Sequence, residues 1–412
     1  MKSITVERSM HIEAPDVHQP ASVIGISYCS NDTPSFIESY RCGTEHAIRR
    51  SEDNGRTWTI CESWESRREL GAGRYLSISL PEFFLDPDNG RMFRIYRTSE
   101  AIEGVKPWDV GAPVGTTLHY IQVSNDEGIT WSEPEQLIQK GDEFDEVHWA
   151  KDIWYGRNYG VIEALRAMKL SDGTILVPFW MAHLFENGSI RSPEDNGVLL
   201  QNVCLFGAWR PDGGGLDWEA GDYVTLPRTH SADGGDEISV DFLPDGRLFQ
   251  IIRARFLNQP EAEWPSCKFF ALSSDRGRTW SEPEPLRYTD GELAYSPACM
   301  GRVFRSKKNG RFYLITNLND WPSHNCDPRS TLQIAEIDPE TLGIIRETVT
   351  PIETRQPGQP INIRFSNWRS YEDRETGEFV LFMTACPGDV GRKFDCGCPP
   401  HCYRYDICLP GK

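Results

Sequence analysis

Apolar runs along the chain come in pairs, and a short glycine-containing turn separates the two members of each pair. Copies of this pattern start at Glu82 (EFFLDPDNGRMFRIYR), Glu163 (EALRAMKLSDGTILVPFW) and Glu237 (EISVDFLPDGRLFQIIR), and again at 301 (GRVFRSKKNGRFYLIT) and 368 (WRSYEDRETGEFVLFMT). A turn with Asp-Gly or Asn-Gly between alternating apolar runs is a strong hairpin signal. The pattern therefore predicts a series of similar β-hairpins.

The hairpins recur at a nearly regular spacing. A weaker sixth copy starts near His18 (HQPASVIGISYCSND), and the turn glycines of the other five are Gly90, Gly173, Gly246, Gly310 and Gly377. Six units in 412 residues leave room for about four short strands per unit. We therefore predict an all-β fold, a six-bladed β-propeller of four-stranded antiparallel sheets that forms a single domain over residues 1–412. Seven blades are the alternative.

A second repeat, Ser-x-Asp-x-Gly-x-Thr-Trp, lies between the hairpins. It occurs as SEDNGRTW (51–58), SNDEGITW (124–131) and SSDRGRTW (273–280), with a degenerate copy, DGGGLDW, at 212–218. Each copy is typical of a turn in which the Asp carboxylate caps the loop and the glycine takes a positive φ. We expect these turns on one rim, between the third and fourth strands of their blades. We also expect the N-terminal segment to close the ring by joining the last blade.

Charge and hydropathy narrow the possible partners. The formal net charge of −18 disfavours nucleic acid. No run of eighteen apolar residues is present, so no membrane span is expected. The N-terminus MKSITVERSMHIEAP lacks the apolar region of a secretory signal. A cytoplasmic location is therefore expected for the chain as encoded, or a secreted one if a signal has been removed.

Four of the twelve cysteines cluster near the C-terminus around His401, at Cys396, Cys398, Cys402 and Cys408. Their spacing is compatible with zinc, with two disulfides or with free thiols in the closing blade. No cofactor is expected, and the sequence leaves a metal site and the oligomeric state open.

Three glutamates occupy the same place in consecutive units. Glu82, Glu163 and Glu237 stand eight, ten and nine residues before their turn glycines. In a propeller this strand is the innermost one of its blade, so the three carboxylates are expected to converge at one end of the axis. Carboxylates brought together raise one another's pKa, an arrangement found where acid–base chemistry takes place. The alternative is that each glutamate only solvates the edge of its sheet.

The eight-residue turns resemble the Asp-box, or BNR, repeat of the sialidase superfamily, and the resemblance covers most of the chain. It implies a propeller whose substrate is an oligosaccharide or polysaccharide. Sialidases begin their carboxylate-binding arginine triad at a position where this chain has His18 in Val-His-Gln-Pro. The family's acid/base Asp precedes the first box, where this chain offers Arg41, Glu45 and His46. These departures imply that sialic acid is a poor substrate.

The rest of the sialidase site is matched in part. The family's glutamate corresponds to Glu237, and its second arginine to Arg253 or Arg255. The third arginine and the nucleophilic tyrosine have no clear match. The nearest candidates for these substrate contacts are Arg302, Arg369 and Tyr371.

Some six-bladed members of this superfamily are exo-acting hydrolases of neutral glycans that use two glutamates. Glu163 and Glu237 lie one unit apart, so they are expected to flank one glycosidic bond as acid and as base or nucleophile, with Glu82 beside them. An exo-acting glycoside hydrolase is therefore the favoured function.

Two alternatives remain open. A polysaccharide lyase would act on a uronate glycan with a His or Tyr base, and His183 is expected near the axis. Further candidates for that base are His18, His46, His119, His148, Tyr40 and Tyr295. The second alternative is a glycan-binding propeller without catalysis.

Overall fold

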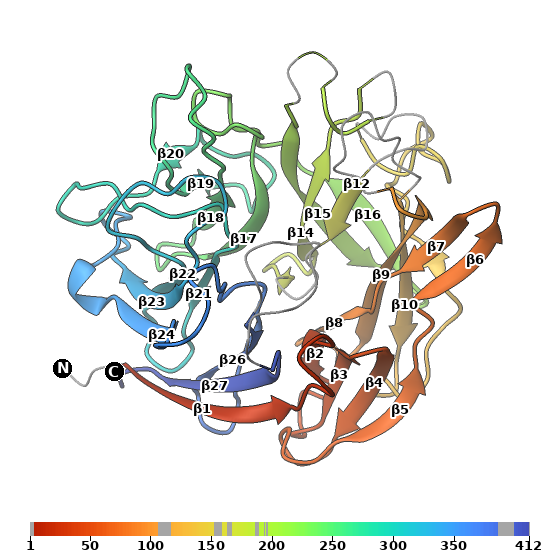
Figure 1. Ribbon diagram of the computed structural model, residues 1–412. Coiled ribbons are helices and arrows are strands. Elements are labelled where there is room, and N and C mark those ends of the chain that lie inside the picture. The colour runs from red at the N-terminus through yellow and green to blue at the C-terminus, as the bar shows by residue number, and fades with distance from the viewer. Residues whose placement is uncertain are drawn as a thin grey trace.

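Six antiparallel sheets surround one axis, as Figure 1 shows. The computed structural model describes residues 4–105, 117–151, 159–162 (backbone only), 167–185, 189–192, 194, 197–385 and 399–411. Within these residues the only helical segment is a 3-10 turn, Arg346–Thr348. No helix in this part of the chain is long and apolar enough to cross a membrane. The predicted all-β, six-bladed propeller is confirmed.

Four blades have four strands each. From the axis outward, blade 1 contains β2 (Ala21–Tyr28), β3 (Phe36–Cys42), β4 (Glu45–Ser51) and β5 (Thr59–Ser63). Blade 4 contains β17 (Asp236–Phe242), β18 (Leu248–Arg253), β19 (Phe269–Ser273) and β20 (Glu284–Pro285). Blade 5 contains β21 (Arg302–Arg305), β22 (Phe312–Thr316), β23 (Thr331–Ile337) and β24 (Thr350–Thr354). Blade 6 contains β25 (Arg369–Glu372), β26 (Phe379–Thr384), β27 (Cys402–Cys408) and β1 (Thr5–Ile12).

Blades 2 and 3 carry additional strands. In blade 3, β12 (Tyr159–Ile162) and β13 (Met168–Lys169) both pair with β14 (Ile175–Ala182), followed by β15 (Leu200–Trp209) and β16 (Leu216–Ala220). Blade 2 has β8 (Glu82–Leu85), β9 (Met92–Ile102), β10 (Thr117–Ser124) and β11 (Glu135–Gln136). An extra hairpin, β6 (Arg67–Gly71) and β7 (Arg74–Ile78), pairs with the part of β9 that extends beyond β8. The sequence repeat did not predict this hairpin.

The ring closes through the N-terminus, as predicted. Strand β1 pairs antiparallel with β27, from Thr5 opposite Cys408 to Ile12 opposite Cys402. A buried ion network joins β1 to blade 1. The fully buried Glu38 lies 2.7 Å from both His11 Nε2 and Arg49 Nη2. Burial alone would raise the pKa of Glu38, but the two basic partners bring it below its usual value.

The eight-residue turns join third and fourth strands on one rim, as expected. In the first copy Asp53 Oδ1 accepts hydrogen bonds from the amides of Arg56 (3.0 Å) and Thr57 (2.8 Å). The hydroxyl of Ser51 accepts one from Gly55 N–H at 2.9 Å, and Gly55 has a φ of 77°. The hydrogen bonds from Thr57 contribute most to lowering the pKa of Asp53 to about 2. The turn is therefore held by its own side chains.

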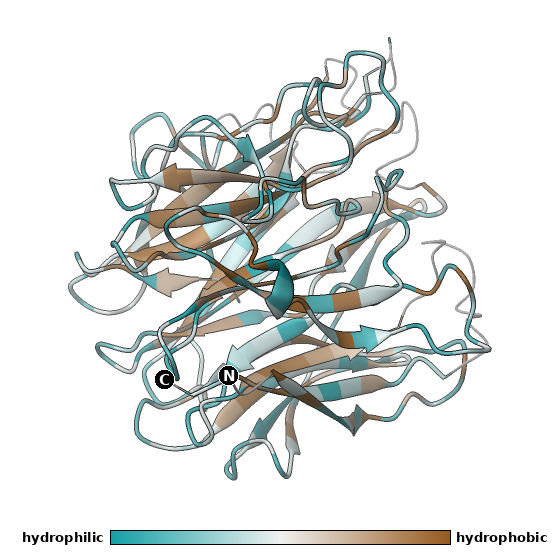
Figure 2. Cartoon of the chain, turned by 90° about the vertical axis from the view of Figure 1, so that its left-hand side faces the viewer, coloured by the Kyte–Doolittle hydropathy of each residue, from teal (hydrophilic) through white to brown (hydrophobic). Residues whose placement is uncertain are grey.

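The hydrophobic core lies between the blades. One cluster, for example, packs Phe36 of blade 1 with Phe83 of blade 2 and Phe382 of blade 6. Figure 2 shows the hydrophobic residues along the strands, whereas most turns at the two ends are hydrophilic. The core is therefore formed by the strands, and the turns at both ends of the axis are mainly polar.

The C-terminal cysteine cluster lies only partly within the described residues. Cys396 and Cys398 lie outside the described residues, whereas Cys402 and Cys408 are free thiols at the two ends of β27. His401 Nδ1 accepts a hydrogen bond from the Ala14 amide at 2.9 Å. No group of three potential metal ligands occurs within the described part of the chain.

Candidate functional site

One end of the axis collects the starts of the inner strands. The inner strands of neighbouring blades lie side by side, with β2 next to β8 and β25, and β17 next to β21. On its other side β17 contacts β14, the second strand of blade 3. Each inner strand begins at the end where its antiparallel partner stops, and the Asp-box turns lie at the opposite end. The first residues of β8, β17, β21 and β25 therefore share one mouth with the last residues of β9 and β18. We call this end the axial mouth.

Arg253, the last residue of β18, contacts two consecutive carboxylates of β17. Its Nη1 lies 2.5 Å from Asp236 Oδ2, and its Nε lies 3.5 Å from Glu237 Oε2. Consecutive side chains of a regular strand point to opposite faces. Here β17 contains a bulge between Asp236 and Ser239, and Glu237 has a φ of 47°. The bulge lets both carboxylates reach the same guanidinium.

The backbone at Glu237 is strained. A positive φ in a residue with a Cβ costs about 1–2 kcal/mol. Such conformations persist only where the surrounding structure holds them, and they cluster at functional sites.

A second ion pair lies beside the first. Arg255 Nη2 is 2.5 Å from Asp233 Oδ2, and the Arg255 amide donates to Ser231 Oγ at 3.0 Å. The loop that carries Asp233 lies directly against β15, where Leu200 N–H donates to Asp233 O at 2.7 Å. At Gly234, with a φ of 74°, a Cβ would come within 2.3 Å of the Leu200 carbonyl oxygen. Only glycine fits this close approach.

Three carboxylates share two guanidinium groups in this cluster. Burial raises the pKa of Asp236 to about 7. Arg253 opposes this rise, and Glu237 and Asp233 add to it. Burial also raises the pKa of Asp233, against the pull of Arg255. The side chain of Glu237 is 25% exposed, whereas those of Asp236 and Asp233 are 6% and 9% exposed. The cluster can thus hold a proton near neutral pH, and Glu237 is its accessible member.

Glu82, another of the three glutamates predicted to converge at the axis, is the first residue of β8. Glu82 Oε1 lies 3.6 Å from Arg369 Nη2, and Arg369 Nε donates to the Ile24 carbonyl at 2.8 Å. These residues line a cavity of about 130 Å³ together with Arg97. Blades 1, 2 and 6 therefore supply one part of the mouth, and blade 4 supplies the other.

Two predicted substrate contacts, Arg302 and Tyr371, line one axial chamber. Arg302 Nη1 donates to the Ser370 carbonyl at 2.9 Å and to its hydroxyl at 2.7 Å. The axial chamber has a volume of about 290 Å³ and also contains Asp241. Tyr371 is buried, with its ring centroid 4.8 Å from that of Phe36, and burial raises its pKa. Neither residue lines the cavity of Glu82, and their role as substrate contacts stays a prediction.

The remaining candidates of blade 1 lie just before β2 and at the hairpin end of β3 and β4. His18 is exposed before β2, and its amide donates to Asp16 Oδ1 at 2.7 Å. Arg41 and His46 are cross-strand partners of β3 and β4, and burial together with Arg41 lowers the pKa of His46. Glu45 accepts a hydrogen bond from the hydroxyl of Tyr40.

The blade 3 candidates are described only in part. His183 follows β14, and its amide donates to Leu199 O at 2.8 Å. Glu163 lies outside the described residues, so its pairing with Glu237 stays a prediction. His119, one of the possible bases, is buried against Trp149 and Phe179, and burial lowers its pKa to about 3.

Sequence reasoning missed Asp233 and Asp236. Both belong to the segment Asp-Gly-Gly-Asp-Glu (233–237), whose close acidic residues and paired glycines were an available signal. It also missed Cys326 of blade 5, whose Sγ lies 3.9 Å from Arg253 Nη2. These residues complete the surroundings of Arg253.

Comparison with known proteins agrees with this architecture. The model of the BNR repeat-like domain family matches residues 47–350. Comparison with curated proteins finds no match. Among solved structures, a protein of unknown function from Dyadobacter fermentans is 16% identical, with 98% of this chain and 99% of that chain covered and a TM-score of 0.58.

Two solved enzymes are also similar in structure. The intramolecular trans-sialidase from Ruminococcus gnavus, in complex with oseltamivir carboxylate, is 13% identical, with 96% of each chain covered and a TM-score of 0.57. The α-L-arabinanase of Penicillium chrysogenum, complexed with arabinobiose, is 13% identical, with 98% of each chain covered and a TM-score of 0.54. At these identities the likeness shows a shared fold.

Proposed function

Because the chain belongs to the family of BNR repeat-like domains, the propellers of the sialidase superfamily, we propose that it is an exo-acting glycoside hydrolase of a neutral glycan. The reaction would take place at the axial mouth, with Glu237 as one of two carboxylates. This function is favoured over the cleavage of sialosides and over lyase chemistry by the way the arginines of the mouth are paired.

The observation that carries the proposal is the pairing of three arginines with carboxylates. Arg253 lies between Asp236 and Glu237, Arg255 pairs with Asp233, and Arg369 pairs with Glu82. A sialidase or a uronate lyase uses cationic groups to bind the carboxylate of its substrate. A guanidinium that already holds a carboxylate has less charge to offer a second one. A neutral sugar requires hydrogen-bond acceptors for its hydroxyl groups instead.

The roles of the residues follow from their exposure and charge. Glu237 is accessible and would exchange a proton with the glycosidic oxygen or with water. Asp236 is buried and Arg253 half-buried beside it, and they would fix its orientation, while burial raises the pKa of Asp236 to about 7 and would let it hold a proton near neutral pH. The second carboxylate would come from Glu163 or Glu82. Their separation from Glu237 would decide the stereochemistry, at about 5 Å for retention and about 6.5–9.5 Å for inversion.

The test is an activity screen on neutral, sialylated and uronate-containing glycans. Arabino-oligosaccharides come first among the neutral ones, because the similar arabinanase was solved with arabinobiose. New reducing ends are followed together with the ultraviolet absorbance of an unsaturated uronate. We expect reducing ends from a neutral glycan and no unsaturated product.

The same screen includes a variant of the proposed catalytic residue and a matched control. Glu237→Gln should lower kcat by about 10²–10⁴-fold, the usual contribution of general acid–base catalysis, with an unchanged melting temperature. Glu282→Gln changes an exposed glutamate beside an Asp-box turn and should have no effect. Unaltered turnover in Glu237→Gln, efficient release of sialic acid, or formation of an unsaturated product would each overturn the proposal. Binding without turnover would favour a glycan-binding propeller.

A further inference from the structure

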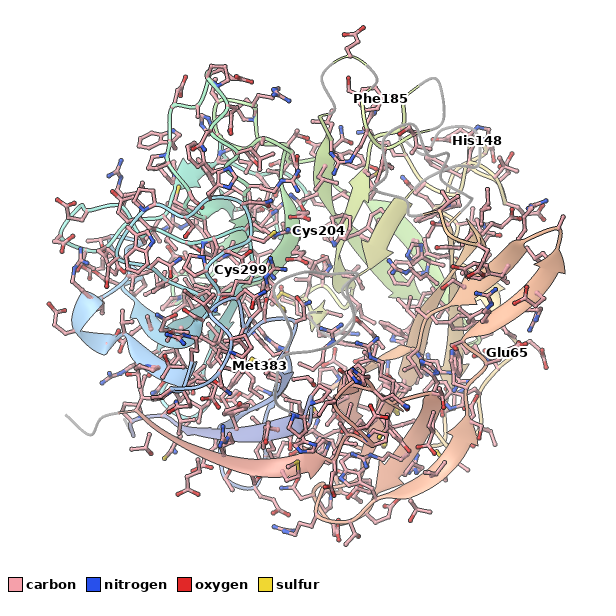
Figure 3. All side chains as sticks on the ribbon, in the orientation of Figure 1. Glu65, His148, Phe185, Cys204, Cys299 and Met383 are labelled. Carbon is pink, nitrogen blue, oxygen red and sulfur yellow. The ribbon has the colours of Figure 1, made fainter. Side chains whose placement is uncertain are left out.

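A cleft of about 670 Å³ opens between blades 1 and 2 at the perimeter of the propeller. One wall is formed by residues 62–65, at the end of β5 and just beyond it. The other wall carries Leu76 and Ile78 of the extra hairpin β6–β7 (Figure 1). The floor is formed by β9 and β10. Glu65, on the rim, lies near the outer edge of the molecule in Figure 3. We call this space the blade 1–2 cleft.

The floor of the blade 1–2 cleft is a row of aromatic rings. Tyr96 and Tyr120 are direct cross-strand partners, and their rings are stacked with centroids 5.7 Å apart at an interplanar angle of 20°. Trp64 meets Tyr96 edge-on, with centroids 5.2 Å apart at 79°. The indole N–H of Trp64 donates to the Ser79 carbonyl at 3.0 Å, which fixes its orientation. Trp64, Tyr96 and Tyr120 are half-buried, so the inter-blade core does not cover these rings.

The packed interface between the blades ends directly below this row. Arg94, two residues before Tyr96 on the same face of β9, is 5% exposed. Its guanidinium donates to Gln122 Oε1 at 2.9 Å and to Glu62 Oε2 at 2.7 Å. Polar contacts thus support the aromatic row from beneath, and the rings form the boundary between the interface and solvent.

The rim of the blade 1–2 cleft carries carboxylates that are each paired with an arginine. Glu62, Glu65 and Glu100 line it, and Arg68 is the single basic residue among the lining residues. Arg68 already binds Glu65 at 2.5 Å. Each carboxylate keeps acceptor sites beyond its one ion pair, because two oxygens provide about four lone-pair positions.

This combination fits one kind of ligand. Adjacent aromatic rings bind the apolar face of a sugar ring, and carboxylates accept hydrogen bonds from its hydroxyl groups. Arg94, Arg68 and Arg74 already pair with Glu62, Glu65 and Glu100, so the rim offers acceptors for hydroxyl groups but no unpaired cation for the carboxylate of a uronate or sialate. The volume lies within the roughly 300–1,000 Å³ of ligand sites in proteins. We propose that the blade 1–2 cleft is a second saccharide-binding site, which holds a neutral glycan chain beside the axial mouth, since Tyr96 lines both this cleft and the cavity of Glu82 and Arg369.

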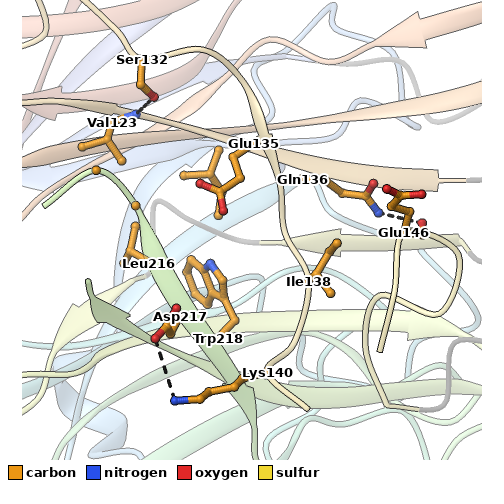
Figure 4. Close-up of a pocket in the computed structure, with 13 residues that line it drawn as sticks. Val123, Ser132, Glu135, Gln136, Ile138, Lys140, Glu146, Leu216, Asp217 and Trp218 are labelled. Carbon is orange, nitrogen blue, oxygen red and sulfur yellow. Dashed lines mark hydrogen bonds and ion pairs between the residues drawn. The ribbon is translucent and has the colours of Figure 1, made fainter. Parts of the chain in front are cut away.

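A cleft on the other flank of blade 2 lacks these features. It has a volume of about 530 Å³ and lies between β11 and β16, as Figure 4 shows. Its tryptophan, Trp218, is 2% exposed and therefore cannot stack on a sugar. On its rim Lys140 pairs with Asp217 at 4.0 Å, and Glu135 pairs with Arg210. The two clefts share blade 2, but only the blade 1–2 cleft presents partly exposed rings.

Native affinity electrophoresis tests the proposal in gels that contain arabinan, arabinoxylan, mixed-linkage β-glucan or polygalacturonate. The full chain carries Glu237→Gln, so that turnover does not consume the polysaccharide. We expect retardation in at least one neutral polysaccharide and none in polygalacturonate. Adding Tyr96→Ala and Tyr120→Ala together should weaken the retarding interaction by about 10- to 100-fold, the range expected for losing buried aromatic surface.

Matched variants separate ring stacking from folding. Tyr96→Phe with Tyr120→Phe keeps both rings and should retain retardation. Tyr75 lies on the β6–β7 hairpin, where its ring contacts Arg67, and it is outside the cleft lining. The Tyr75→Ala variant should therefore bind polysaccharide like the parent. Melting temperatures check folding, and the single Tyr120→Ala variant serves if the double one is unstable.

Three results would overturn the proposal. These are no retardation in any neutral gel, full retardation of a folded Tyr96→Ala, Tyr120→Ala protein, or a preference for polygalacturonate. The outcome is separable from the proposed catalytic function, because binding is read without turnover. If Glu237→Gln retains activity, the catalytic proposal fails while retardation by the blade 1–2 cleft still stands.

Discussion

Replacing Arg253 with methionine tests whether the ion cluster of the axial mouth is organised as the structure indicates. The change keeps much of the side-chain length but leaves Asp236, which is 6% exposed, and Glu237 without the guanidinium between them. Removing one partner of a buried ion pair costs about 3–5 kcal/mol, because the other charge stays buried. We expect Arg253→Met to destabilise the protein by this amount at pH 8.

The loss should be smaller at low pH. Burial already places the pKa of Asp236 at about 7, above the ordinary 3.8 of an unfolded chain, and removing the opposing Arg253 raises it further. Between the two values the folded state binds more protons than the unfolded state, so stability falls as pH rises. At pH 5 the carboxyls of the variant can protonate, and most of the penalty should disappear.

Urea unfolding at pH 5 and pH 8 measures both effects. Asp236→Asn in the Arg253→Met background removes one of the carboxylates left without a cationic partner. It should restore about 2 kcal/mol of the free energy of unfolding at pH 8, as expected for residues in contact. Arg278→Met is the control, since its partner Glu219 is 57% exposed and such surface pairs contribute about 0–1 kcal/mol. A cost below about 1 kcal/mol for Arg253→Met that is equal at both pH values would refute the description of the cluster as a buried, shared-proton site.

Three further changes address other parts of the fold. Burial lowers the pKa of His119 to about 3, so between pH 7 and pH 5 only the unfolded state binds a proton at this residue, and the protein loses on the order of 2 kcal/mol of stability. His119→Phe should remove this loss. Equal pH slopes of the two proteins in urea unfolding would contradict the prediction. Glu38→Gln should cost about 1–3 kcal/mol at pH 7 by disrupting the contacts with His11 and Arg49. The pKa of Glu38 is lowered in the folded state, so this difference should shrink as pH falls below the unfolded value of 4.5; a constant difference in melting experiments would argue against the ion network. Gly234→Ala should lower the free energy of unfolding by more than about 1 kcal/mol and reduce turnover, since the added Cβ would meet a main-chain oxygen of β15. Normal stability and activity of this variant would show that the loop can move.

The architecture was predictable because its signals are local and repeat. The Asp-box turns are held by bonds within eight residues, such as those from Thr57 to Asp53, so the same letters give the same turn wherever they occur. The number of blades followed from the spacing of the hairpin glycines. The hairpin β6–β7 was not predictable in this way, since its sequence RRELGAGRYLSI (67–78) has no counterpart in the other units. The spacing of a repeat cannot predict an insertion that occurs in only one unit.

The site was predictable only to the level of the backbone. Register placed Glu82 and Glu237 at the starts of inner strands, and the structure has them there, each beside an arginine. Register does not determine where a side chain points. Arg302 opens an inner strand in the same way, yet its guanidinium binds Ser370 and lines the axial chamber.

The alternation of a β-strand hid the most informative residue of the site. If β17 were regular, Asp236 would face away from Glu237, and a search for converging carboxylates would discard it. The bulge and the positive φ of Glu237 reverse that expectation and bring both carboxylates to Arg253. Strain of this kind requires support, and the preceding loop is anchored to β15 by the hydrogen bonds from Leu200 N–H to Asp233 O and from Gly235 N–H to Leu200 O. An acidic pair that follows two glycines at the start of an inner strand is therefore a better pointer to such a cluster than a single glutamate in register.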